Sequence, residues 1–62
     1  MNDLEMFTDL CQRNNMKYIM VDIWEADTNA YAGVAVELYN NHGTIGRVEF
    51  SPQGRLKNCV CY

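Results

Sequence analysis

Cys59 and Cys61, two cysteines one residue apart, are the residues of this 62-residue chain that most directly suggest chemistry. Thiolates at such spacing can bind a soft metal ion, act as a redox pair or enter a disulfide. If they lie on a strand, both point to one face with Cα atoms about 6.5–7 Å apart, which is poor geometry for a disulfide between them. Two thiols also supply only half of the usual four ligands of zinc. We therefore expect no metal and no cofactor within one chain.

The other candidate ligands and nucleophiles do not complete a site. Cys11 falls in a predicted helix, and His42, the only histidine, falls in a predicted turn exposed to solvent. No nucleophile has a histidine partner, and no glycine-rich stretch precedes a helix. The sequence therefore predicts no enzyme, no catalytic residue and no small-molecule substrate. One alternative remains, in which two chains meet near their last strands and bind a metal through Cys59 and Cys61 of each chain.

Hydrophobic periodicity predicts the elements that position these residues. The segment from Asn2 to Asn15 has apolar residues at helical spacing, with Asn2 as a suitable N-cap and Glu5 three residues later. From residue 17 onward, apolar and polar residues alternate as in strands separated by turns. We predict one α+β domain over residues 1–62, with an antiparallel meander of order 1-2-3-4. Its helix covers about 3–14, and its strands cover about 17–25, 30–40, 44–51 and 55–61.

The turn sequences predict how these strands pair. Loops at 26–29, 41–43 and 52–54 suit the Asn, Gly and Pro residues found there. With these loops, one face collects the apolar residues that the helix should cover: Ile19, Val21, Ile23, Ala32, Val34, Val36, Leu38, Val48, Phe50, Leu56 and Val60. The predicted cross-strand pairs on the other face are Trp24–Tyr31, Met20–Ala35, Glu37–Arg47 and Glu49–Lys57. The agreement of apolar and charged pairs supports this register.

The second face of the predicted sheet has no helix to cover it. The predicted register places on it Tyr18, Met20, Trp24, Tyr31, Tyr39 and Arg47, together with Cys59 and Cys61. Aromatic residues, Met and Arg are enriched in protein interfaces. We therefore predict a contact surface, anchored by Trp24, for a second copy of the chain or for another protein. The alternative that these aromatic residues reflect only strand propensity stays open.

Single-stranded nucleic acid is another candidate ligand for an aromatic sheet face. The predicted face carries three basic and three acidic residues: Arg47, Arg55 and Lys57 with Asp22, Glu37 and Glu49. The whole chain has a net charge of -3. Such a face has no net positive field to hold phosphates, so the charge balance argues against this alternative.

The first ten residues carry three acidic residues, no basic residue and no long apolar run. This pattern is unlike that of a signal peptide or a membrane span, and an odd number of cysteines argues against a disulfide scaffold. We expect a cytoplasmic protein with reduced thiols. The sequence thus predicts a small non-catalytic protein-interaction module, homodimeric through its uncovered face. Its size and lack of catalytic motifs further suggest an accessory or inhibitor protein of a phage or other mobile element.

Overall fold

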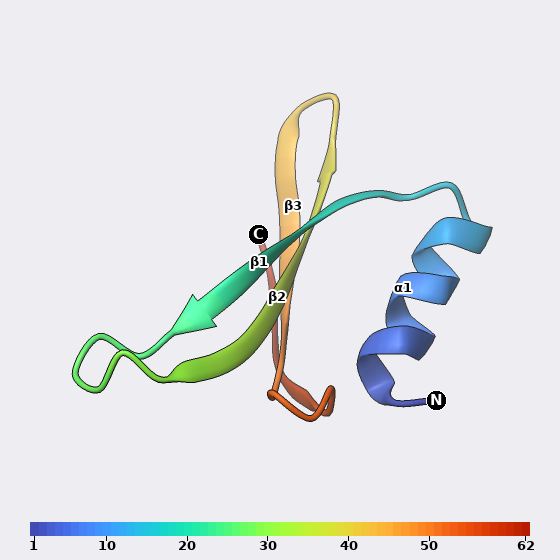
Figure 1. The fold of residues 1–62 in the computed structure, drawn as a ribbon. Coiled ribbons are helices and arrows are strands. Elements are labelled where there is room, and N and C mark those ends of the chain that lie inside the picture. Colours follow the sequence, from blue (N-terminus) through green and yellow to red (C-terminus); the bar gives the residue numbers. More distant parts are fainter.

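A computed structural model describes residues 1–62 and shows one helix beside a four-stranded antiparallel sheet (Figure 1). In chain order the elements are α1 (Asp3–Arg13), β1 (Lys17–Trp24), β2 (Tyr31–Asn40), β3 (Gly43–Phe50) and β4 (Leu56–Cys61). The strands lie in the order β1-β2-β3-β4, so each strand pairs with its neighbour in sequence. The predicted α+β fold and its meander are confirmed.

The ends of α1 follow from the local sequence. Asn2 is the N-cap, and its Oδ1 accepts a hydrogen bond of 2.8 Å from the backbone N–H of Glu5. Asp3 and Glu5 in the first turn and Arg13 in the last turn complement the helix dipole. Beyond the helix, Asn15 takes a left-handed φ of 55°, which asparagine tolerates better than most residues. No helix of the chain combines the length and the apolar character needed to cross a bilayer.

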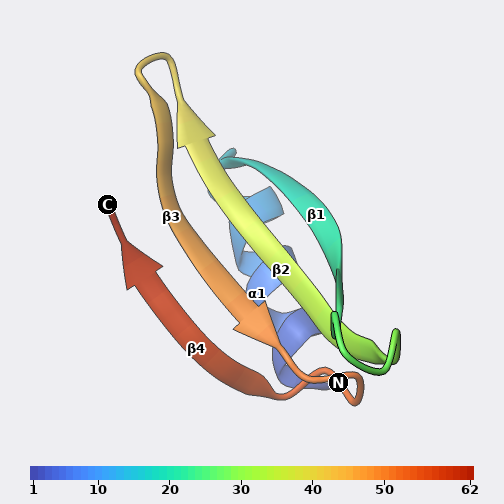
Figure 2. The same ribbon diagram turned by 90° about the vertical axis from the view of Figure 1, so that its left-hand side faces the viewer.

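Helix α1 packs on one face of the sheet and leaves the other face uncovered (Figure 2). The core lies between the helix and the two central strands, and it is small, with nine of 62 residues buried. Its buried side chains are Val34, Val36, Val48 and Phe50, with Leu4, Phe7, Tyr18 and Leu38 packed against them. The rings of Phe7 and Phe50 have centroids 5.7 Å apart. A core of this size gives a domain little stability to spare.

The start of α1 is tied to the turn between β3 and β4 by hydrogen bonds. The backbone N–H of Leu4 donates to the carbonyl of Gly54 at 2.9 Å, and the carboxylate of Asp3 accepts from the backbone N–H of Leu56 at 2.9 Å. Gly54 has a φ of +81°, and a Cβ on it would lie 2.2 Å from the side-chain nitrogen of Asn2. A side chain at this position would be strained by the positive φ and would displace the capping side chain of Asn2, which favours glycine.

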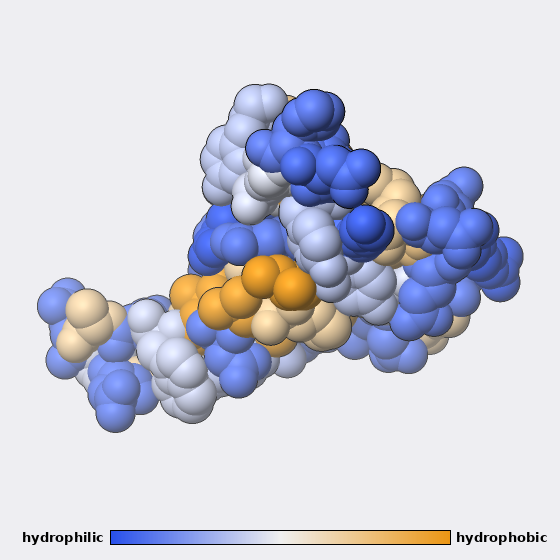
Figure 3. Space-filling model, turned by 90° about the horizontal axis from the view of Figure 1, so that it is seen from above, coloured by the Kyte–Doolittle hydropathy of each residue, from blue (hydrophilic) through white to orange (hydrophobic).

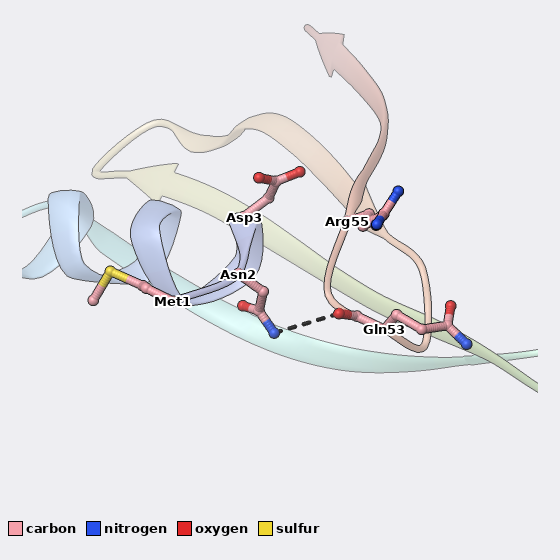
Figure 4. A pocket seen from close by; sticks show the side chains of 5 residues that line it. All are labelled: Met1, Asn2, Asp3, Gln53 and Arg55. Atoms are coloured by element: carbon pink, nitrogen blue, oxygen red, sulfur yellow. Dashed lines mark hydrogen bonds between the residues drawn. The ribbon is translucent and has the colours of Figure 1, made fainter.

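Figure 4 shows the same junction, with Asn2 Nδ2 donating to the carbonyl of Gln53 at 3.4 Å. The hollow there is lined by Met1, Asn2, Asp3, Gln53 and Arg55. The groups of Asn2 and Asp3 that face it already cap the helix or hold the turn. These hydrogen bonds fix the start of α1 to the β3–β4 turn, and the hollow lies at this structural junction.

A β-bulge in β2 changes the predicted pairing of β1. Trp24 lies opposite Tyr31 as predicted, but Ile23 lies opposite Gly33, so Ala32 is an extra residue. Beyond it every pair is displaced by one, and Met20 lies opposite Val36 instead of Ala35. Because side chains alternate with a period of two, this single residue turns the side chains of β1 to the other face of the sheet.

Two further bulges occur on β3 and β4. Ile45 is an extra residue near the β2–β3 turn, and Glu37 still lies opposite Arg47 as predicted. On β4 the extra residue is Lys57, so Glu49 lies opposite Asn58 and not Lys57. The side chains of β4 beyond this bulge are thereby also turned to the other face.

The faces of the two central strands are as predicted, whereas those of β1 and most of β4 are reversed. Ile19, Val21, Ile23 and Val60 were expected under the helix but lie on the uncovered face. Tyr18, Met20, Cys59 and Cys61 were expected on the uncovered face but lie on the helix side. The prediction paired regular strands and included no bulge. One extra residue reverses the faces of all side chains beyond it, which is the physical reason for both errors.

Candidate protein interface on the uncovered sheet face

The face of the sheet that is turned away from α1 (Figure 2) is called the open face below. The strand register places aliphatic residues on it around a central group of charges. One row across it contains Ile19, Glu37, Arg47 and Val60, and the next contains Val21, Ala35, Glu49 and Asn58. The remaining members are Lys17, Ile23, Gly33 and Tyr39. Ala35 is fully buried although no helix covers it, and the larger residues Val21 and Glu49 lie beside it on the neighbouring strands.

Arg47, Glu37 and Glu49 form a charged cluster at the centre of the open face. The Nη1 atom of Arg47 lies 2.8 Å from Glu37 Oε2, and its Nε lies 3.1 Å from Glu49 Oε2. The hydrogen bond to Glu49 is the main cause that raises the pKa of Arg47, with Glu37 adding to it and partial burial opposing it. One cation thus faces two anions, so the cluster leaves no free positive charge for a phosphate.

Along β1, aliphatic side chains of the open face are exposed to solvent. Ile19 and Val21 are 49% and 41% exposed, and Val60 on the opposite edge is 40% exposed. Seen from above, a strongly hydrophobic area of the surface lies over β1 (Figure 3). An open antiparallel sheet usually presents polar side chains to water, so an exposed aliphatic strip on this face is unusual.

The structure separates the residues that were predicted to form one aromatic contact surface. Tyr39 and Arg47 lie on the open face as predicted. Tyr18 lies on the helix side, where its hydroxyl accepts a hydrogen bond of 3.0 Å from Gln12 Nε2. Met20, opposite Val36 of the core, lies on the helix side as well.

Trp24 and Tyr31 form an aromatic pair at the end of the β1–β2 hairpin, which points away from α1 (Figure 1). Their ring centroids are 5.3 Å apart with an interplanar angle of 66°. Alternation along β1 places Trp24 on the side of Tyr18 and not on the open face. The pair is therefore exposed, but it is separate from the aliphatic surface.

The cysteines do not converge with other ligands. Cys59 and Cys61 are exposed free thiols on the helix side of β4, whereas Cys11 is buried in α1 and its burial raises the pKa of its thiol. No three side chains of His, Cys, Asp or Glu are grouped to hold a metal ion. The alternative of a metal-bridged dimer through the uncovered face is wrong in its placement of these thiols.

Sequence reasoning missed the aliphatic members of this surface, namely Ile19, Val21, Ile23 and Val60. The available signal was Gly33 in the middle of an apolar strand, because glycine inside a strand often marks a bulge. Gly33 has a φ of +127°.

Comparison of the chain with models of protein families, with curated proteins and with solved structures finds no match. The functional argument therefore rests on the geometry of this surface.

Proposed function

We propose that the protein is a non-catalytic protein-interaction module that binds another polypeptide through its open face. The observation that carries this proposal is the exposed aliphatic strip of β1, with Ile19 and Val21 almost half exposed beside a charged cluster. Burial of aliphatic side chains supplies binding free energy of about 25 cal/mol per Å² of apolar surface. Fixed charges within the same surface supply selectivity between partners.

The charged cluster indicates the chemistry of the partner. Arg47 is already held by the carboxylates of Glu37 and Glu49, which leaves a net charge of about -1 at the centre of the face. A partner with a hydrogen-bond donor or a basic side chain at this position would satisfy the remaining carboxylate oxygens. A phosphate would meet repulsion there, so single-stranded nucleic acid is the weaker candidate.

A cytoplasmic location forms part of the proposal. All three cysteines are free, and two of them are exposed on β4. Exposed thiols persist in a reducing compartment. A role as an accessory or inhibitor protein, of phage or other mobile-element origin, would suit a small chain that acts by covering another protein.

Site-specific photo-crosslinking tests the proposal. Benzoylphenylalanine at Val60 places a reactive group on the open face, and the same residue at Glu5 places it on exposed α1 as a control. In native cells we expect a discrete covalent adduct from position 60 and none from position 5. The substitution Arg47→Glu should reduce the adduct, because it puts three carboxylates together. Equal adducts from both positions, or none from position 60, would overturn the proposal.

A further inference from the structure

Strand β1 is an edge strand with only one of the features that usually prevent edge pairing, the charge of Asp22, which lies on the helix side opposite Val34. It has eight residues, of which Ile19 and Val21 are exposed on the open face and Met20 on the helix side. Its only charged residues are Lys17 at its start and Asp22. A long, exposed and apolar edge presents free backbone N–H and C=O groups to another strand. Edges of natural sheets are commonly blocked by a bulge, a proline or a lysine in the middle of the strand.

The opposite edge, β4, does have such features. It has six residues, a bulge at Lys57 and a polar side chain at Asn58. A lysine and a bulge within the strand both oppose the addition of a further strand. Of the two edges, β1 is longer and has fewer protective features, so it is the more open to pairing.

We propose that a second copy of this chain pairs with β1 in antiparallel orientation, which makes a continuous eight-stranded sheet. A two-fold axis relates the two copies, so both contribute the same edge and the assembly closes as a dimer. Residues opposite each other must share a face of the sheet, which requires the axis to pass through a residue of β1. The charges of the strand then select that residue.

An axis at Val21 places Lys17 opposite Glu25 of the partner subunit, and by symmetry this contact occurs twice. Glu25 directly follows β1, and its carboxylate accepts a hydrogen bond of 3.2 Å from Thr28 Oγ1. Lys17 and Glu25 form no ion pair within their own chain. Opposite charges directly across a sheet are stabilising, and like charges are destabilising. An axis at Asp22 would place two carboxylates side by side, and an axis at Met20 would place Lys17 opposite an isoleucine. Charge complementarity therefore favours Val21.

The apolar residues agree with the same register. On the open face, Ile19 lies opposite Ile23 of the partner subunit, next to the two Val21 side chains on the axis. On the helix side, Tyr18 lies opposite Trp24 of the partner subunit, which gives an aromatic cross-strand pair. The dimer joins two exposed aliphatic strips into one patch and puts both open faces on one side. It enlarges the surface of the proposed function but forms whether or not a partner protein binds there.

Sedimentation velocity of the reduced protein over a range of concentrations tests the dimer, with a matched pair of variants. Val21→Lys places two lysines together on the axis. Val60→Lys is the control, because it makes the same change on the same face at the other edge, and Val60 is 40% exposed where Val21 is 41% exposed. We expect a wild-type dimer. Val21→Lys should raise its dissociation constant about 100-fold or more, and Val60→Lys should leave it within about threefold. Circular dichroism of each variant checks that the monomer is folded.

The other outcomes each contradict the edge dimer. Loss of the dimer in both variants would indicate that the sheets stack face to face. Loss only in Val60→Lys would indicate pairing through β4. A wild-type protein that stays monomeric at all concentrations would exclude self-pairing. A charge exchange tests the register. Lys17→Glu and Glu25→Lys should each weaken the dimer about tenfold, and the double variant should restore it. Additive weakening in the double variant would overturn the axis at Val21. The crosslinking at Val60 reports on the open face separately.

Discussion

The two central strands and the two outer strands differ in what their side chains do. Strands β2 and β3 supply the whole buried core of the sheet, with Val34, Val36, Val48 and Phe50. No residue of β1 or β4 is buried, although both strands are rich in apolar residues. Stability is thus concentrated in the middle of the sheet, and apolar surface available for binding is concentrated at its margins. The following variants test this division.

The largest effect is expected in the central strands. Phe50 is 1% exposed, and its ring packs on that of Phe7. Phe50→Ala should lower the free energy of unfolding by about 3–5 kcal/mol, measured by urea denaturation. Phe50→Leu provides a milder variant if the alanine variant does not fold. Val60→Ala, a truncation in an outer strand, should cost less than about 1 kcal/mol, and a similar loss in both strands would refute the division.

The bulge that sets the face of β1 gives the second effect. Gly33 has a φ of +127°, and a Cβ on it would lie 2.0 Å from the backbone oxygen of Phe50. Gly33→Ala should cost about 3 kcal/mol or more, because both the backbone and its neighbour must shift. Gly43→Ala is the control, since Gly43 has a φ of +120° with no atom within 4 Å of a Cβ. It should cost only about 1–2 kcal/mol in thermal unfolding; equal costs would mean that the close approach at Gly33 is unimportant.

The central charged cluster is expected to contribute less. Arg47→Met leaves Glu37 and Glu49 near each other without a cation, and should destabilise the fold by about 1 kcal/mol at neutral pH. Arg13→Met removes the more exposed ion pair with Asp9 and should cost at most about 0.5 kcal/mol. Denaturation at low salt compares the two variants. A smaller loss for Arg47→Met than for Arg13→Met would contradict the structural role of the cluster.

The cysteines provide the smallest and most local test. Cys59 and Cys61 in the outer strand should react with iodoacetamide rapidly at pH 8, and Cys11 only slowly, because burial raises the pKa of its thiol. The same shift stabilises the fold below the ordinary pKa of cysteine, and this contribution falls as the pH rises above it. Mass spectrometry should therefore count two fast adducts. Stability should fall less between pH 8 and pH 10 in Cys11→Ala than in the wild type.

The sequence predicted the parts of the fold that depend on local signals. The cap at Asn2, the helix, the four strands and the pairing of Glu37 with Arg47 follow from residue types and turn sequences. The faces of β1 and β4 depend on bulges at Ala32 and Lys57. Glycine at position 33 gave a signal for the first bulge, whereas nothing in the alternation around Lys57 distinguishes a bulged strand from a regular one.

The sequence predicted that one face of the sheet is uncovered, but it did not predict most of the residues that lie on that face. An uncovered face opposite a single helix follows from the element count, and Tyr39 and Arg47 lie on it as predicted. Its aliphatic members could be identified only from the observed strand register, because a shift of one residue places Val21 on the open face where Met20 was predicted. The difference between the two edges likewise depends on the position of the bulge in β4.

Residue-resolved hydrogen exchange of the reduced wild-type protein, at low and high concentration, tests the central claim most directly. It compares the backbone amides of β1 and of β4 that point away from the neighbouring strand. If a second copy pairs with β1, these amides of β1 should exchange at least about tenfold more slowly at high concentration, while those of β4 should be unchanged. Equal and concentration-independent exchange at both edges would contradict the account.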